Sequence, residues 1–321
     1  MKAIINEKYG PPEVLQLKEA EKPTPNDNEV LVKVHATSVN YNNLLFVKGE
    51  PFVGRIWTGI LKPKLKIPGN DVAGRIEVIG RNVEQFQPGD EVFGDIFVCG
   101  FGAFAEYVSV PENILTLKPS NISFEEAAAV PEAALVALQA LRDKGQIHTG
   151  QKVLIYGAYG GIGTFAVQIA KYFGAEVTGV CSTRNLDMVR SIGADHVIDY
   201  TLEDFTQKDQ RYDLIVACAG YRSIFDYKRA LRPNGTYVAT GGSMKQIFQA
   251  LLLGPWISKT GGKKLANWTV IPNKDLDFIK ELIEACKVKP VIDRRFPFHQ
   301  VAEALRYYGQ GHARGKVIIT M

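Results

Sequence analysis

The sequence feature that most constrains the fold is a glycine-rich turn between an apolar segment and an amphipathic one. Residues 153–156 are strand-forming, and an apolar pattern of helical period begins at Phe165. Four glycines lie between them: Gly157, Gly160, Gly161 and Gly163. Glycines at such a turn permit a tight bend, close approach of the backbone to a pyrophosphate, and close packing of the helix on the strand. The segment therefore predicts a strand–turn–helix unit that binds a dinucleotide.

The phosphate contacts are expected over the turn itself, where the helix N-terminus presents free N–H groups and the positive end of its dipole. Ala158 occupies the first key position of the glycine fingerprint, and Gly160 and Gly163 occupy the other two. The alternative interpretation is an ordinary tight connection, but the flanking strand and helix favour nucleotide binding. The cofactor-binding residues expected in the turn are Ala158, Tyr159, Gly160, Gly161, Ile162 and Gly163.

Strand and helix segments alternate beyond residue 152. The predicted strands cover residues 153–156, 176–181, 196–199, 214–217 and 235–240. This alternation predicts an α/β fold with a doubly wound parallel sheet. By contrast, the first 120 residues alternate with period two and carry frequent turn signals. That pattern predicts a β-rich, barrel-like unit.

Other segments carry clear signals for single elements. Ser123 and Glu126 form a predicted capping box, and helical texture follows it as far as Leu141. An amphipathic helix is predicted over residues 276–286 and a strand over residues 315–321. Periodicity does not assign this last strand to either region.

The end of the second predicted strand bears on cofactor choice. In NAD-binding sheets an acidic residue there binds the ribose hydroxyls. In this chain Ser182, Thr183 and Arg184 follow the strand, and no acid stands at its tip. Hydroxyls and a guanidinium suit a 2′-phosphate, which predicts NADPH, although Arg184 is alternatively a solvated residue that starts the next helix. Residues at later strand ends complete the expected cofactor site: Tyr200, Ala219, Gly241 and Gly242.

Composition excludes several classes of function. The net charge is +4, with 38 basic and 34 acidic residues spread along the chain, so a nucleic-acid partner is not expected. The four cysteines lie far apart without a Cys/His cluster, which predicts reduced thiols and no metal site. The N-terminus lacks an apolar signal segment, and the longest apolar stretch, residues 247–257, is too short to span a bilayer. We therefore expect a cytoplasmic protein without integral membrane association.

Further motifs occur in order along the whole chain: Ser38-Val-Asn40, Pro68-Gly-Asn-Asp71-Val-Ala-Gly74, Pro88-Gly-Asp90, Ala128-Ala-Val-Pro131, Ile192-Gly-Ala-Asp195 and Gly315-Lys-Val-Ile318. With the glycine turn they resemble the medium-chain dehydrogenase/reductase superfamily, and more narrowly its zinc-independent NADPH:quinone oxidoreductase family. The resemblance implies a GroES-like catalytic domain formed by residues 1–120 and 288–321. It also implies a Rossmann NADP-binding domain formed by residues 121–287, and a homodimer.

The same resemblance implies NADPH-linked hydride transfer to a quinone or an α,β-unsaturated carbonyl. Zinc-using relatives carry an early cysteine and a Gly-His-Glu near position 70, whereas this chain has Ser38-Val-Asn40 and Gly69-Asn-Asp71. We therefore expect no zinc, and hydrogen-bond donors would polarise the acceptor oxygen. The resemblance places Asn40 near the nicotinamide. Tyr41 would either donate its phenol proton or form a wall of the pocket.

Departures from the family pattern leave other functions open. Tyr41-Asn-Asn43, Glu132 and Val136 replace the usual residues of the pocket. An alcohol or aldehyde dehydrogenase of the same superfamily is one alternative, which the missing zinc ligands disfavour. A non-catalytic NADPH-binding redox sensor is another. The apolar stretch 247–257 is predicted to be a core helix, with a substrate lid, a dimer contact or a membrane-touching helix as alternatives.

Overall fold

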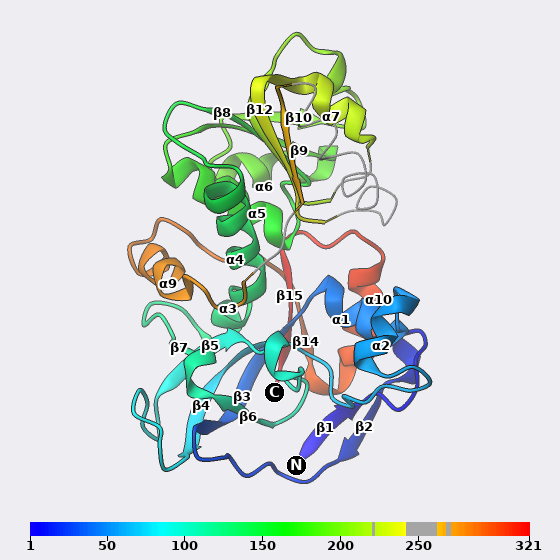
Figure 1. Ribbon diagram of the computed structural model, residues 1–321, viewed down its shortest axis with the longest axis vertical. Coiled ribbons are helices and arrows are strands. Elements are labelled where there is room, and N and C mark those ends of the chain that lie inside the picture. The colour runs from blue at the N-terminus through cyan, green and yellow to red at the C-terminus, as the bar shows by residue number, and fades with distance from the viewer. Residues whose placement is uncertain (220–221, 242–261, 268–270) are drawn as a thin grey trace. The chain divides into compact units, whose positions relative to one another are not determined.

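The computed structural model describes residues 1–219, 222–241, 262–267 and 271–321 (Figure 1). The chain forms two compact units. The terminal unit comprises Met1–Glu132, Pro272–Glu284 and Pro290–Met321, and the central unit comprises Ala133–Ile271 and Ala285–Lys289. The apolar stretch 247–257 lies outside the described residues.

The central unit is built on a six-stranded sheet in which every neighbouring pair is parallel (Figure 1). Its strands lie in the order β10 (His196–Asp199), β9 (Glu176–Cys181), β8 (Lys152–Tyr156), β11 (Tyr212–Ala217), β12 (Leu231–Ala239) and β13 (Lys264–Asn267). Chain order reverses at β8, because β9 pairs with one side of it and β11 with the other. This is the predicted doubly wound sheet, and ligands bind such sheets at the point of reversal.

Helix α4 (Pro131–Gln139) precedes β8 along the chain. Three further helices connect later strands: α5 (Gly161–Tyr172), α6 (Leu186–Ser191) and α7 (Ile224–Ala230). A π-helical segment, Ala140–Lys144, continues α4, and the 3₁₀ segments are Thr183–Asn185 and Phe205–Gln207. The predicted helical face of α5 is buried, with Phe165 and Ile169 fully inaccessible. Burial of such a face, more than helix propensity, stabilises a helix of this length.

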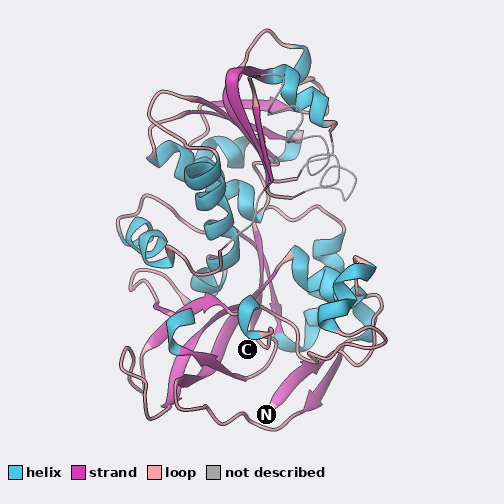
Figure 2. Ribbon diagram, in the orientation of Figure 1, coloured by secondary structure: helices cyan, strands magenta, loops and turns pink. Residues whose placement is uncertain are grey.

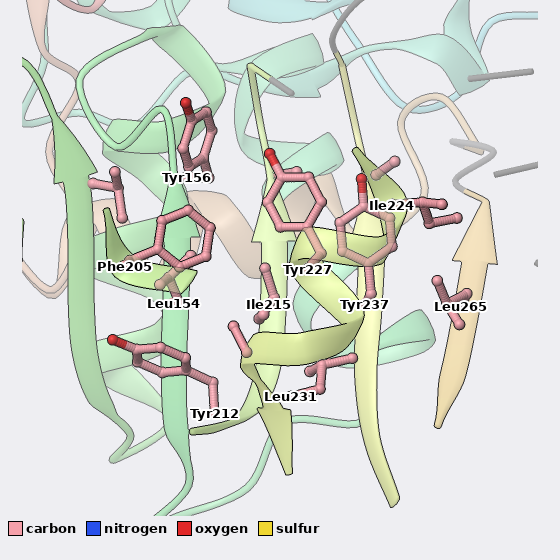
Figure 3. Packing of buried hydrophobic residues seen from close by; sticks show 14 of the residues in the cluster. Leu154, Tyr156, Phe205, Tyr212, Ile215, Ile224, Tyr227, Leu231, Tyr237 and Leu265 are labelled. Carbon is pink, nitrogen blue, oxygen red and sulfur yellow. The ribbon is translucent and has the colours of Figure 1, made fainter. Parts of the chain in front are cut away.

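Aromatic rings fill one face of the central sheet (Figure 3). Tyr227 and Tyr237 stack with ring centroids 4.8 Å apart, and Tyr156 lies 5.8 Å from both Phe205 and Tyr227. These separations fall in the range that aromatic pairs favour. Because Tyr156 is the last residue of β8, this packing fixes the strand end from which the glycine turn begins.

The terminal unit contains a larger, mostly antiparallel sheet, whose strands Figure 2 shows in magenta. The order is β14 (Ile292–Pro297), β15 (Lys316–Thr320), β3 (Glu29–Val39), β4 (Asp71–Ile79), β5 (Glu91–Asp95) and β7 (Thr116–Leu117), and β6 (Tyr107–Pro111) also pairs with β3. A separate hairpin joins β1 (Lys2–Ile5) to β2 (Gln16–Glu19). The C-terminal strand, which periodicity left unassigned, therefore belongs to this sheet through its pairing with β3.

The helices of the terminal unit are α1 (Tyr41–Lys48), α2 (Arg55–Thr58), α3 (Phe124–Ala128), α9 (Leu276–Glu284) and α10 (Val301–Gly309). The capping box at α3 is confirmed, because the Glu126 N–H donates to Ser123 Oγ and the Ser123 N–H donates to Glu126 Oε2. The helical texture predicted beyond it is divided, since α3 ends at Ala128 and α4 begins at Pro131. Proline lacks an N–H and suits the first position of a new helix.

Two predicted strands begin two or more residues earlier in the structure: β11 begins at Tyr212 rather than at residue 214, and β12 begins at Leu231 rather than at residue 235. β12 thus includes Pro233, Asn234 and Gly235, which are residue types typical of turns. The register of β12 on β11 shifts opposite these residues, and Asn234 takes a positive φ of 63°. These residues therefore lie at an irregularity within the strand rather than at its start.

Candidate functional site

The glycine turn of the central unit has the backbone geometry of a dinucleotide cradle. Gly157 follows β8 with a φ of 80°, a conformation that side chains disfavour. A Cβ built on Gly163, in the first turn of α5, would lie 2.1 Å from the Gly157 carbonyl oxygen. Glycine at these two positions therefore permits the bend and the close packing of α5 on β8.

Ala158 fits the first position of the glycine fingerprint because the residue that faces its methyl group, Gly179 of β9, has no side chain. Ala158 is fully buried, and a Cβ built on Gly179 would lie only 3.2 Å from the Ala158 methyl group. The rest of the turn, Tyr159 to Ile162, is partly accessible, and α5 begins at Gly161 with Gly160 as its N-cap. The first N–H groups of a helix have no intrahelical acceptor, so this accessible end suits a phosphate.

The tip of β9 carries the predicted residues together with Asp199, the residue before the predicted Tyr200. Thr183 and Arg184 are exposed and Ser182 is partly exposed. Thr183 Oγ1 donates to Asp199 Oδ2 over 2.5 Å, and this hydrogen bond lowers the pKa of Asp199. The expectation that no acid lies at this tip is therefore wrong. Asp199 is the last residue of β10, and the parallel pairing of β10 with β9 places it beside Cys181. The residue pattern of β9 alone does not show which residues of β10 lie beside it.

The later strand ends approach the same turn. A Cβ built on Gly157 would lie 2.8 Å from the Ala219 methyl group, so Ala219 is in contact range of the glycine turn. Gly241 follows β12, and a Cβ built there would lie 2.6 Å from the Cys218 carbonyl oxygen. Tyr200 follows β10, with its ring centroid 6.4 Å from that of Tyr156. Gly242 lies outside the described residues.

The terminal unit contains a cluster of polar side chains centred on Asn40, and most of its members are buried. We call it the polar cluster, and its members are Ser38, Asn40, Asn43, Asn70, Asp71, Asp95, Glu132 and Lys316. Asn40 Nδ2 donates to Asp71 Oδ2 over 2.8 Å and to Asn70 Oδ1 over 3.2 Å, and Asn40 Oδ1 accepts from Lys316 Nζ. The side-chain amide of Asn40 thus has protein partners on both its nitrogen and its oxygen.

Asp71 and Lys316 form the ionic centre of the polar cluster. Lys316 Nζ lies 3.2 Å from Asp71 Oδ2, and the side chains are 2% and 0% exposed. Asp71 also accepts from Ser38 Oγ over 2.6 Å and from the Glu132 N–H over 3.0 Å. A buried ion pair is stable only when additional hydrogen bonds satisfy it, and these donors meet that requirement.

Two further carboxyl groups share the amide of Asn70. Its Nδ2 donates to Asp95 Oδ1 and to Glu132 Oε2, each over 2.9 Å. Burial, reinforced by the negative charge of Asp71, raises the pKa of Asp95 to about 7 and that of Glu132 to about 8. A carboxyl group that titrates near neutral pH holds and releases a proton under ordinary conditions, which is the property needed for acid–base chemistry.

Comparison with known proteins places this architecture in a family. Residues 26–120 match the alcohol dehydrogenase GroES-like domain, and residues 192–319 match the zinc-binding dehydrogenase domain. The chain is 34% identical to the chloroplast envelope quinone oxidoreductase homolog of Arabidopsis thaliana, over 92% of this chain and 91% of the relative. The chain belongs to the medium-chain dehydrogenase/reductase superfamily. It is an oxidoreductase.

Other members of the superfamily support the same placement. The 2-methylene-furan-3-one reductase of Solanum lycopersicum is 33% identical over 99% of this chain and 79% of its own length. A mitochondrial NAD(P)H oxidoreductase of Mus musculus is 33% identical over 100% and 89%. The solved quinone oxidoreductase of Coxiella burnetii superimposes with a TM-score of 0.89 at 29% identity, covering 100% of this chain and 99% of that one. The predicted GroES-like and Rossmann fold is thereby confirmed.

A zinc ion does not fit the polar cluster of this superfamily member. The donors nearest Asp71 are the Ser38 hydroxyl, the Asn40 amide and the Lys316 ammonium, whereas zinc prefers thiolate, imidazole and carboxylate ligands. Lys316 already supplies a positive charge against Asp71. Among the described residues, no group of three or more His, Cys, Asp or Glu side chains could hold a metal ion.

The predicted catalytic residues occupy different environments within this unit. Asn40 is 5% exposed and serves as the N-cap of α1, whereas Tyr41, the first residue of that helix, is 50% exposed. The sequence interpretation did not assign Asp71, Asp95 or Lys316 to the site. Two of these residues lie in segments that the sequence analysis compared with the family, namely Gly69-Asn-Asp71 and Gly315-Lys-Val-Ile318. Those segments were the available signals for assigning Asp71 and Lys316 to the site. Nothing along the chain indicated that Lys316 contacts Asn40, 276 positions away.

Proposed function

We propose that this oxidoreductase is a zinc-independent NADPH-dependent reductase that transfers hydride to a quinone or an α,β-unsaturated carbonyl. The observation that carries the proposal is the Lys316–Asp71 pair beside Asn40, because it places an ammonium ion where a Lewis-acidic metal would need anionic ligands. The names of the quinone oxidoreductase and enone reductase relatives agree with it. An alcohol dehydrogenase that depends on zinc finds no suitable donor set in the polar cluster.

The reduction requires a hydride and a proton. NADPH, when bound over the glycine turn, would supply the hydride, and the acceptor would take up the proton. The polar cluster contributes groups suited to supplying the proton, because the carboxyls of Asp95 and Glu132 hold protons near neutral pH. Asn40, held at its oxygen by Lys316 and at its nitrogen by Asp71, is a rigid element beside the nicotinamide in the family arrangement that we carry over to this chain. Tyr41, half exposed next to it, is the proposed hydrogen-bond donor to the acceptor.

We propose NADPH as the preferred dinucleotide. The exposed Arg184 guanidinium and the hydroxyls of Ser182 and Thr183 suit a 2′-phosphate. Asp199 opposes this preference in principle, since a carboxylate at this tip can accept from a ribose hydroxyl. Its two oxygens, however, accept from Thr183 Oγ1 and from the Thr201 hydroxyl and N–H. A carboxylate engaged in this way competes weakly for a ribose, so Arg184 dominates the selectivity.

The proposal includes assembly and location. We retain a homodimer as the working assembly and the cytoplasm as the location. No helix among the described residues is long and apolar enough to cross a membrane.

A panel assay tests the proposed function. NADPH oxidation is followed by absorbance with quinones, enones and aldehydes, before and after dialysis against a chelator. The proposal predicts turnover of quinones or enones that the chelator does not change. Turnover of aldehydes alone, lost on chelation, would identify an alcohol dehydrogenase. Tight NADPH binding without turnover of any acceptor would identify a redox sensor.

A further inference from the structure

The segment between α1 and β4 turns its apolar side chains toward solvent. We call residues 51–66 the apolar loop, which includes the 3₁₀ turn Phe52–Gly54 and α2 (Figure 1). Seven of its apolar side chains are between 37% and 92% exposed: Phe52, Val53, Ile56, Trp57, Ile60, Leu61 and Leu65. Single apolar residues are normal on a protein surface, but seven exposed apolar side chains within one 16-residue segment favour an interaction site.

Polar groups anchor the apolar loop to neighbouring backbone and to Tyr9. Arg55 Nε donates to the Gly49 carbonyl over 2.9 Å, and its guanidinium lies 4.4 Å from the centroid of the Tyr9 ring. Tyr9 in turn donates to the Gly59 carbonyl over 2.7 Å, and the Lys64 N–H donates to the Thr58 carbonyl over 2.8 Å. The loop is therefore a built structure whose hydrogen bonds face inward and whose apolar side chains are held outward.

The charge of this region has a single sign. Residues 51–70 contain Arg55, Lys62, Lys64 and Lys66 and no aspartate or glutamate. The three lysines are exposed. Lys62 and Lys64 form no ion pair among the residues that the structure describes, whereas the charge of Lys66 acts on the carboxylate of Glu7. The three lysines alternate with the exposed Leu61 and Leu65 and the buried Pro63, so basic side chains lie next to two exposed leucines.

We propose that the apolar loop docks the protein on the surface of an anionic lipid bilayer. Segments that bind at the boundary between lipid headgroups and acyl chains typically combine exposed tryptophan, phenylalanine and leucine with lysine. An anionic surface also supplies counter-charges for Lys62 and Lys64. A second copy of the chain fits less well, because a symmetric contact through this loop would bring the same basic side chains together.

Vesicle co-sedimentation tests this proposal with the full-length chain. Vesicles of phosphatidylcholine alone are compared with vesicles that also contain phosphatidylserine. We expect binding to the phosphatidylserine vesicles that weakens as the ionic strength rises. Each lysine near an anionic surface strengthens binding about fivefold. The double variant Lys62→Gln/Lys64→Gln should therefore lower the partition coefficient for the phosphatidylserine vesicles about 25-fold. The matched control is Leu117→Ser, which alters a side chain 44% exposed in β7 and should change nothing.

A fluorescence measurement locates the contact. Vesicles that carry brominated acyl chains should quench the tryptophan emission of the unchanged protein, and Trp57→Phe should remove that quenching while leaving co-sedimentation in place. Unchanged thermal unfolding of each variant verifies its fold. Absence of sedimentation with phosphatidylserine vesicles, or equal binding by the lysine variant, would overturn the proposal. A Leu61→Ser variant that converts a dimer to a monomer in analytical ultracentrifugation would also overturn it, by assigning the loop to a second copy.

Discussion

Lys316 Nζ lies 3.2 Å from Asp71 Oδ2 inside the terminal unit, and neither side chain reaches solvent appreciably. The pair joins two strands that are not neighbours in the sheet, because β15 and β4 lie on opposite sides of β3. Asn40, at the end of β3, bridges them through both ends of its amide. The position of Asn40 therefore depends on this ion pair.

Removal of the lysine should destabilise the fold strongly. Lys316→Met leaves the Asp71 carboxylate buried without its cation, and we expect a loss of about 3–5 kcal/mol in the free energy of unfolding, measured with urea. The double variant Lys316→Met/Asp71→Asn removes both charges, keeps one oxygen acceptor for the donors around Asp71, and should recover part of that loss. A single variant as stable as the parent would show that the pair does not stabilise the fold.

Stability should fall as the pH rises through neutrality. The pKa values of Asp95 and Glu132 are raised to about 7 and about 8 in the folded chain, well above the ordinary values of these groups. The folded state therefore binds more protons than the unfolded state between about pH 4 and pH 8. The stabilisation that protonated Asp95 and Glu132 give the folded state is therefore complete below about pH 4 and is lost as the pH rises through 7 and 8.

Glu132→Gln should flatten this dependence, because glutamine keeps an oxygen acceptor for Asn42 and Asn70 without titrating. The measurement is the urea unfolding free energy at a series of pH values. We expect the unfolding free energy of the parent to fall by several kcal/mol between pH 5 and pH 9, at about 1.4 kcal/mol per pH unit for each group, and that of the variant to fall less. Parallel curves for the two proteins would contradict the raised pKa of Glu132.

The glycine turn offers a matched pair of alanine substitutions. A Cβ at Gly163 would lie 2.1 Å from the Gly157 carbonyl oxygen, whereas a Cβ at Gly160 would lie 3.8 Å from the same atom. Gly163→Ala should therefore cost about 1–3 kcal/mol of unfolding free energy and weaken dinucleotide binding. Gly160→Ala should leave stability within about 1 kcal/mol of the parent. Equal stability losses would contradict the close packing of α5 on β8.

Cofactor selectivity should depend on Arg184. Arg184→Glu removes the proposed partner of a 2′-phosphate and adds a repelling charge, so the KM for NADPH should rise at least tenfold more than the KM for NADH. Arg314→Glu, at an exposed arginine of the terminal unit, is the charge-matched control and should affect neither cofactor. Equal changes for NADPH and NADH in the Arg184 variant would contradict the assignment.

The sequence predicted local features well and contacts between distant segments poorly. The glycine turn, the capping box at Ser123 and the strands of the central sheet follow from residue patterns a few positions long, and the structure contains them. Asp199 reaches the tip of β9 only through the register of two parallel strands. Lys316 reaches Asn40 only because the last strand returns to pair with β3. Neither relationship has a periodic signal, so neither was predicted.

The most direct test of the central claim is the rate of NADPH oxidation by a quinone, measured on protein whose metal content has been determined after dialysis against a chelator. The account predicts an unchanged rate with far less than one zinc per chain. A rate that falls on chelation and returns when zinc is added would contradict it, because the reaction would then depend on a metal.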